Sequence, residues 1–447
     1  MDIVKFIKMI QSYKLSFGKI KNKICSKLSK DLIYGMLVKG VIIISQLLII
    51  PIYISELGQE VYGEWIMITV IPNYLILSDL GLTTTVSNQI SYYNVLKNYG
   101  KMIGLFKSTN FLIIIIGLTI LLFFVISLYY IDYHSLLNIY IIDREKVSLI
   151  LLFFIINIVA TLLLNFNLSY FRSIDKYYMN QKYVFVSYCI DLIITLIVLK
   201  TSKNLILIPV LFTFSKIFLL FVTIFKLSKY ENYEYGFSKN IREVKKILPS
   251  SLSYSLYSIG FGLILQGNTF IVGKVLGTNS VVIFNTVRTL VNTMRSFMSI
   301  IYLPKMPKYN ILLSSERISE AKVVFKKNLQ QVIILTLLSG LFITLFYKTL
   351  LYYWIHKELV ITKTFIFLMI FGAVLHTIWN AVSMVTLSIN KTFQLLLFPA
   401  MGVVSILIQY FYLNTFGLEL ASFFLLIIDL IMLVTVFVKT NKIIKLY

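Results

Sequence analysis

Long apolar stretches recur along the chain, with short polar segments between them. A helix needs about 20 mostly apolar residues to cross a bilayer. Twelve stretches reach or approach that length, and the fifth and ninth are the shortest. They are residues 32–54, 62–80, 109–130, 147–168, 184–199, 205–225, 250–273, 281–303, 331–347, 364–387, 393–412 and 417–438. The pattern predicts an all-α integral membrane protein with twelve transmembrane helices.

The composition indicates that lipid surrounds most of the chain. Hydrophobic residues make up 58% of the sequence and charged residues 14%, whereas a soluble domain carries about 25% charged residues. The net charge of +23 would also suit a protein that binds nucleic acid. However, the 34 Phe and 30 Tyr lie within apolar runs and not between basic residues. Composition therefore argues against a soluble protein and against nucleic-acid binding.

The basic residues predict an orientation. With a cytoplasmic N-terminus, the tails and loops on the cytoplasmic side carry 30 Lys and Arg, and the external loops carry 8. Cytoplasmic loops hold an excess of Lys and Arg, which also suits anionic lipid headgroups. We therefore expect a multi-pass membrane protein with both termini in the cytoplasm.

The spans divide into two halves of six. We expect a basic cytoplasmic tail (1–31), a first six-helix bundle (32–225), a cytoplasmic linker (226–249) and a second six-helix bundle with a short cytoplasmic C-terminus (250–447). The loop "YISELGQEVYG" after the first span is echoed by "VGKVLGTNSVVIF" after the seventh, and Gly58 and Gly277 are 219 residues apart in a chain of 447. Parallel repeats of this kind are typical of transporters with a site between two bundles.

Three motifs resemble the polysaccharide transport family, the O-antigen flippases of the multidrug/oligosaccharidyl-lipid/polysaccharide exporter superfamily. The first is "ELGQEVYGEWIMITVIPNYLILSDLGL", with a Leu-Gly turn, a Tyr-Gly-x-Trp helix start and an Asp-Leu-Gly-Leu ending. The others are "KKILPSSLSYSLYSIG", which enters span seven, and "FGLELASFF", which opens span twelve. One departure is "VVIFN" at the start of span eight, where relatives often have Val-Gly-Tyr.

The resemblance implies two six-helix bundles around a central cavity. It implies a substrate of undecaprenyl diphosphate that carries one oligosaccharide repeat unit of O-antigen, the polysaccharide of lipopolysaccharide, or a similar surface polysaccharide. The unit would pass from the cytoplasmic to the periplasmic leaflet of the bacterial inner membrane by alternating access, often coupled to a proton or sodium gradient. Membrane lipids, the polysaccharide polymerase and the chain-length regulator are the implied partners.

Polar residues within the spans are candidates for the substrate pathway, because burying them in lipid is costly. Span eight places Asn285, Arg288, Asn292, Arg295 and Ser299 at steps of 3 and 4 residues, hence on one helix face. A basic, hydrogen-bonding stripe suits an anionic diphosphate, because Arg grips phosphate with a planar fork. The alternative is helix–helix packing, with each Arg bound to a carboxylate or carbonyl.

Span seven carries an uncharged stripe of small and polar residues at similar spacing. Such residues fit either close helix packing or the substrate pathway. They are Ser251, Ser255, Ser258, Gly262 and Gln266.

Four further charged residues within the spans are candidates for the pathway or for ion coupling. Lys39 either joins the pathway or extends to the inner headgroups. Lys216 and Asp191 lie on spans five and six, whose tight hairpin brings them within about a turn of each other. This pair is either a structural ion pair or part of the pathway. Asp429 has no evident partner in the sequence, and Asp429 and Asp191 are the candidates for a coupling-ion site.

The sequence offers no catalytic, cofactor or metal site. It lacks a Gly-Lys-Ser/Thr phosphate loop, and its three histidines and two cysteines lack ligand spacing. We expect a flippase that is not an enzyme. A multidrug extruder of the same superfamily is the alternative, although it would favour acidic residues toward a cationic drug. A polysaccharide polymerase fits less well, because such enzymes carry a large external loop.

Overall fold

A computed structural model describes residues 30–31, 33–76, 81–230, 232–239, 244–245, 258–357, 359–389 and 397–446, and every regular element among them is a helix. The first helix is Ile33–Leu57. The others are α2 (Gln59–Ile76), α3 (Leu82–Val95), α4 (Tyr99–Tyr130), α5 (Tyr133–Leu136), α6 (Arg144–Ser173), α7 (Tyr177–Thr201), α8 (Leu207–Leu227), η1 (Leu263–Gly267), α10 (Asn268–Leu276), α11 (Thr278–Tyr302), η2 (Leu303–Lys305), α12 (Met306–Ser314), α13 (Ile318–Ile355), α14 (Lys363–Ser388), α15 (Leu397–Phe416) and α16 (Leu418–Leu446).

The predicted order of spans is present in the structure. Ten helices of the described residues, one of them Ser258–Leu276, are long and apolar enough to cross a membrane. α2 and α11 are less apolar and occupy the positions of the second and eighth predicted spans. The prediction of an all-α membrane protein is therefore confirmed.

Several helices are longer than the apolar runs that predicted them. α13 has 38 residues, whereas the apolar run covers 331–347. At 1.5 Å per residue this helix is about 57 Å long, against a hydrocarbon core of about 30 Å. α4 likewise begins at Tyr99, ten residues before the predicted span. Apolar runs mark only the part of a helix that faces lipid, so they miss its polar extension.

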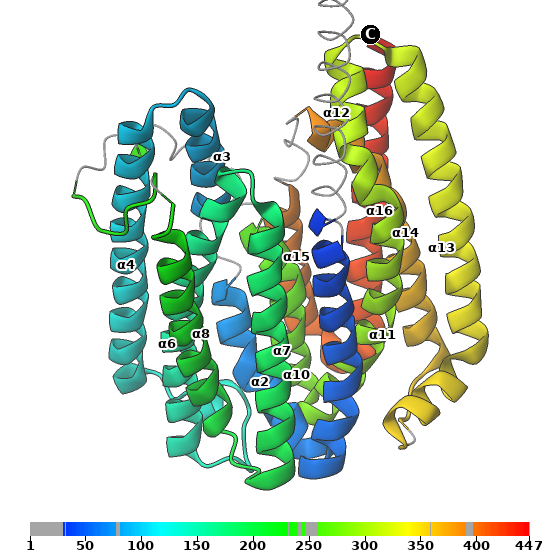
Figure 1. Ribbon diagram of the computed structural model, residues 1–447. Helices are drawn as coiled ribbons and strands as arrows, with labels where there is room; N and C mark the ends of the chain where they lie inside the picture. Colours follow the sequence, from blue (N-terminus) through cyan, green and yellow to red (C-terminus); the bar gives the residue numbers. More distant parts are fainter. Residues whose placement is uncertain are drawn as a thin grey trace, which may run out of the picture.

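The two halves of the chain lie on opposite sides of the molecule. In Figure 1, α4, α6 and α8 lie on one side, α13, α14 and α16 on the other, and α2 and α10 lie between them. In the first half, α6 contacts α2, α3, α4, α7 and α8, and in the second half α14 contacts α11, α12, α13 and α16. Each half is thus organised around one central helix.

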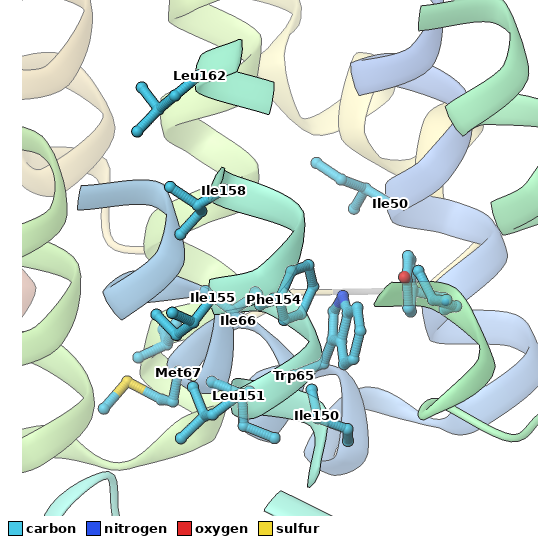
Figure 2. Packing of buried hydrophobic residues seen from close by; sticks show 14 of the residues in the cluster. Ile50, Trp65, Ile66, Met67, Ile150, Leu151, Phe154, Ile155, Ile158 and Leu162 are labelled. Atoms are coloured by element: carbon cyan, nitrogen blue, oxygen red, sulfur yellow. The ribbon is translucent and has the colours of Figure 1, made fainter. Parts of the chain in front are cut away.

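The core of the first half forms where α2 meets α6 (Figure 2). Trp65 of α2 stacks against Tyr53 of the first helix, with ring centroids 5.8 Å apart, and tilts against Phe154 of α6 at 5.7 Å. Ile66 and Met67 of α2 are also buried there. The Tyr-Gly-x-Trp motif therefore places its tryptophan in the core, where dispersion and close packing favour helix association in lipid.

The first part of the predicted linker packs against the first half. Tyr233 is buried against Phe106 and Tyr170, with ring centroids 5.3 and 5.0 Å away. Glu234 forms an ion pair of 2.9 Å with Lys107 of α4. Residues 232–239 therefore lie on the end of α4 and α6, while the domain division at residue 226 stays a prediction.

The two halves meet at equivalent turns. Gly58 and Gly277 both have φ of +84°, a conformation that L side chains rarely adopt, and each separates two consecutive helices. A Cβ on Gly63 of α2 would come 2.6 Å from the carbonyl oxygen of Thr278, the first residue of α11. α2 and α11 therefore cross in close contact, and the echo between the two loops corresponds to matching turn geometry.

Candidate functional site

The second half encloses a cavity of about 40 Å³ whose lining is apolar except for four ionisable side chains. Arg288 and Arg295 come from α11, His376 from α14 and Asp429 from α16. One water molecule needs about 10–15 Å³ by this measure, so the cavity has room for a few waters, a small ion or the end of a larger charged group.

Neutral groups hold Arg288 in place. Its Nη1 donates to the carbonyl oxygen of Leu265 at 2.9 Å and to Thr269 Oγ1 at 2.7 Å, and its Nη2 donates to Asn285 Oδ1 at 2.8 Å. Leu265 belongs to η1, a π-helical turn of a kind that often occurs at functional sites. These partners keep the guanidinium oriented and leave its positive charge without a neutralising carboxylate among them.

The predicted stripe on α11 divides into separate contacts. Arg295 lines the cavity, and its Nη1 donates to Asn292 Oδ1 at 3.0 Å. Asn285 also reaches the first half, where its Nδ2 lies 3.4 Å from the Tyr62 hydroxyl on α2. The lining of the cavity includes both arginines and neither asparagine. Asn285 and Asn292 instead hydrogen-bond the arginines from one turn earlier on the same helix.

Asp429 has partners that the sequence did not reveal. His376 Nδ1 lies 2.7 Å from Asp429 Oδ1, and the indole N–H of Trp379 donates to the same oxygen at 2.9 Å. The expectation that Asp429 lacks a partner was wrong, because His376 and Trp379 are about 50 residues away on the neighbouring helix α14. Its side chain is 11% exposed, so the carboxylate depends on these two hydrogen bonds. The sequence reasoning missed His376 because an isolated histidine shows no spacing.

Lys216 and Asp191 form the ion pair that the hairpin predicts. Lys216 Nζ lies 2.5 Å from Asp191 Oδ2 and 2.6 Å from Ser187 Oγ. The pair joins α7 to α8 in the first half and does not line the second-half cavity. The geometry fits the structural alternative, and a coupling role for Asp191 stays a prediction.

The remaining predicted residues lie apart from the cavity. Lys39 is exposed on the first helix, and Gln266 is half-buried in η1; neither contributes to the cavity lining. Ser258 and Gly262 precede η1 on the same helix. Ser251 and Ser255 lie outside the described residues, so the uncharged stripe of span seven is only partly described.

Glu64 is a buried carboxylate that the sequence reasoning did not single out. It is 1% exposed and accepts hydrogen bonds from the backbone N–H groups of Tyr140, Ile141 and Ile142 at 2.6, 2.8 and 2.8 Å. These residues lie in the loop between α5 and α6. Glu64 therefore fixes that loop on α2.

Metal binding has no support in the described part of the chain, where no three His, Cys, Asp or Glu side chains gather.

No protein-family model matches this chain, and no curated protein matches it. Solved structures do match it. The inward-facing conformation of a multidrug resistance MATE family transporter of the MOP superfamily is 15% identical, with a TM-score of 0.74 over 94% of this chain and 97% of that one.

This chain has the fold of the MATE transporters. The outward-facing conformation of a multidrug resistance MATE family transporter is 14% identical with a TM-score of 0.68, over 94% of this chain and 95% of the other. A third structure is a MOP superfamily transporter from Pyrococcus furiosus, described as having a binding pocket of reverse polarity that suggests a different function. It is 14% identical with a TM-score of 0.64, over 94% of this chain and 95% of the other. At these identities the likeness shows the MATE-like fold of twelve helices in two bundles and leaves the substrate open.

Proposed function

We propose that this protein is an alternating-access transporter whose substrate carries an anionic group, and that the substrate is a lipid-linked oligosaccharide. The observation that carries the proposal is that two arginines on one face of α11, Arg288 and Arg295, line the cavity. The MATE-like fold supports the transporter class, since two bundles around a central site can open to either side in turn. The proposal places the protein in the inner membrane with both termini cytoplasmic.

The arginines suit a diphosphate by charge and by shape. Arg288 and Arg295 are seven residues apart, so their backbones are separated by roughly 10 Å along α11. Each guanidinium offers a planar fork of donors that matches phosphate oxygens. The cavity is too small for an oligosaccharide, so the proposal assigns the diphosphate to the arginines and places the sugar outside this cavity. No bond is made or broken, and the protein acts without a cofactor.

The His376–Asp429 pair is the proposed coupling site. Protonation of Asp429, or a cation bound to it, would change its hydrogen bonds with His376 and Trp379. Because Arg288 and Arg295 line the same cavity, a change of charge at Asp429 would alter the field on the bound anion. Coupling-ion binding and substrate binding would thus influence each other through one cavity.

A multidrug extruder is the second candidate function, and the comparisons favour it. The similar solved structures include multidrug resistance transporters. Asp429 supplies a carboxylate that a cationic drug would require. In this candidate Asp429 binds the substrate and the arginines are structural.

Ligand binding to the purified protein separates the two candidates. We would measure the affinities of undecaprenyl diphosphate and of ethidium, a cationic dye, for the parent protein and for Arg288→Ala, Arg295→Ala and Asp429→Asn. Loss of one charge-assisted contact should weaken diphosphate binding by roughly 10-fold to 100-fold in each arginine variant. The control is Arg317→Ala, since Arg317 forms an exposed ion pair with Glu320 outside the cavity. Ethidium binding that depends on Asp429 and not on the arginines would instead support the extruder.

A further inference from the structure

α5 and the loop that joins it to α6 reach across to the second half of the chain. Asn138 Nδ2 donates to the carbonyl oxygen of Lys274 at 2.9 Å, near the end of α10. Lys274 Nζ in turn donates to Asn138 Oδ1 at 2.9 Å and to the carbonyl oxygen of Ser135 at 3.0 Å. The two halves are therefore joined by reciprocal hydrogen bonds at this end of the molecule.

Glu64 gives this loop a fixed shape. Its carboxylate accepts three successive backbone N–H groups, from Tyr140 to Ile142. Asn138 has φ of +50°, a left-handed conformation that asparagine readily adopts just after the end of a helix, here α5. Glu64 is thus a positioning residue that presents Asn138 to Lys274.

Close packing lies next to these hydrogen bonds. A Cβ on Gly63 would clash with Thr278, and a Cβ on Gly273 would come 2.1 Å from Met67 Sδ on α2. Glu64 directly follows Gly63, and Lys274 directly follows Gly273. The polar contacts and the tight crossing of the two halves therefore occupy one place, at the end that the charge pattern predicts to be external.

We propose that Glu64, Asn138 and Lys274 form a latch that holds the external end of the transporter closed and that opens in each transport cycle. The inference rests on the proposed alternating-access function. The chain superposes better on the inward-facing MATE structure than on the outward-facing one, with TM-scores of 0.74 and 0.68. Hydrogen bonds of this kind can be exchanged for bonds with water at small net cost, so the latch is reversible.

Distances between spin labels test the latch directly. Glu60 of α2 and Asn279 of α11 are exposed and line the same open pocket at this end. We would label Glu60→Cys and Asn279→Cys in a protein in which Cys25 and Cys189 are Ser, and measure the distance distribution in lipid nanodiscs. The parent should show mainly a short distance. The double variant that combines Asn138→Ala and Lys274→Ala should raise the ratio of long to short distances about tenfold, as loss of a charged hydrogen bond predicts.

The control variant is Lys203→Ala. Lys203 Nζ lies 3.0 Å from Glu56 Oε2, so this lysine also makes a charged contact at the same end, but within the first half. Its distance distribution should equal that of the parent. Glu64→Gln keeps the shape of the side chain and removes the charge, and it should give an intermediate increase. Lys274→Met keeps the aliphatic stem and repeats the test if the double variant aggregates.

An unchanged distribution in Lys274→Met and Glu64→Gln would overturn the latch. The distances do not depend on any substrate, so the latch and the transport function can fail separately. A protein that opens in these variants and yet transports neither diphosphate nor dye would keep the latch and contradict the proposed function.

Discussion

The ion pair between Lys216 and Asp191 makes a sharp prediction about stability. Lys216 Nζ lies 2.5 Å from Asp191 Oδ2 and donates a further hydrogen bond to Ser187 Oγ at 2.6 Å. Lys216 is 6% exposed. Removing one partner of a buried pair leaves an uncompensated charge and costs about 3–5 kcal/mol. Replacing both partners by apolar residues of similar volume is often neutral, because neither charge then needs solvation.

We therefore expect Lys216→Met and Asp191→Leu each to lower the thermal unfolding midpoint of the detergent-solubilised protein by several degrees. The double variant should recover most of that loss. Substrate binding at the second-half cavity should be unchanged in the double variant, since the pair lies in the first half. If the double variant lowers the unfolding midpoint by as much as the two single variants together, the structural ion pair is refuted. A double variant that is stable but does not transport would show a functional role for the pair.

Three further predictions follow from the structure. For topology, Tyr140→Cys should react with an impermeant thiol reagent from outside the cell, and Asn98→Cys only after the membrane is opened; the reverse labelling would contradict the orientation. Gly63→Val should sharply reduce the amount of folded protein, because its side chain would clash with α11, whereas Gly104→Val should not, because nothing lies within 4 Å of a Cβ there; equal amounts in membrane blots would contradict the close crossing. Asp429→Asn should make substrate transport insensitive to an imposed proton or sodium gradient, and a retained gradient response in proteoliposomes would exclude Asp429 as the coupling site.

The fold was largely predictable because lipid imposes a length and a composition on each span. Apolar runs marked twelve positions even where α2 and α11 are less apolar than the rest. The hairpin of α7 and α8 also predicted a contact, because a short turn fixes the register of antiparallel helices. The echo between the Gly58 and Gly277 turns likewise appears as matching backbone geometry.

The candidate site was predictable only in part. Helical periodicity placed Arg288 and Arg295 on one face, since that follows from local spacing. Which of their neighbours line the cavity depends on how α11 meets η1 and α14, and local spacing carries no such information. The partners of Asp429 and of Glu64 are more than 45 residues away in sequence. Such contacts arise from tertiary packing alone.

The most direct test of the central claim is transbilayer movement of a lipid-linked sugar in proteoliposomes. An undecaprenyl diphosphate-linked oligosaccharide would be placed in both leaflets, and an impermeant glycosidase would report how much becomes accessible from outside. We expect the parent protein and Arg317→Ala to expose the inner pool, and Arg288→Ala with Arg295→Ala to fall to the level of protein-free liposomes. Exposure of the inner pool at the parent rate without both arginines would contradict an arginine-lined path for an anionic substrate.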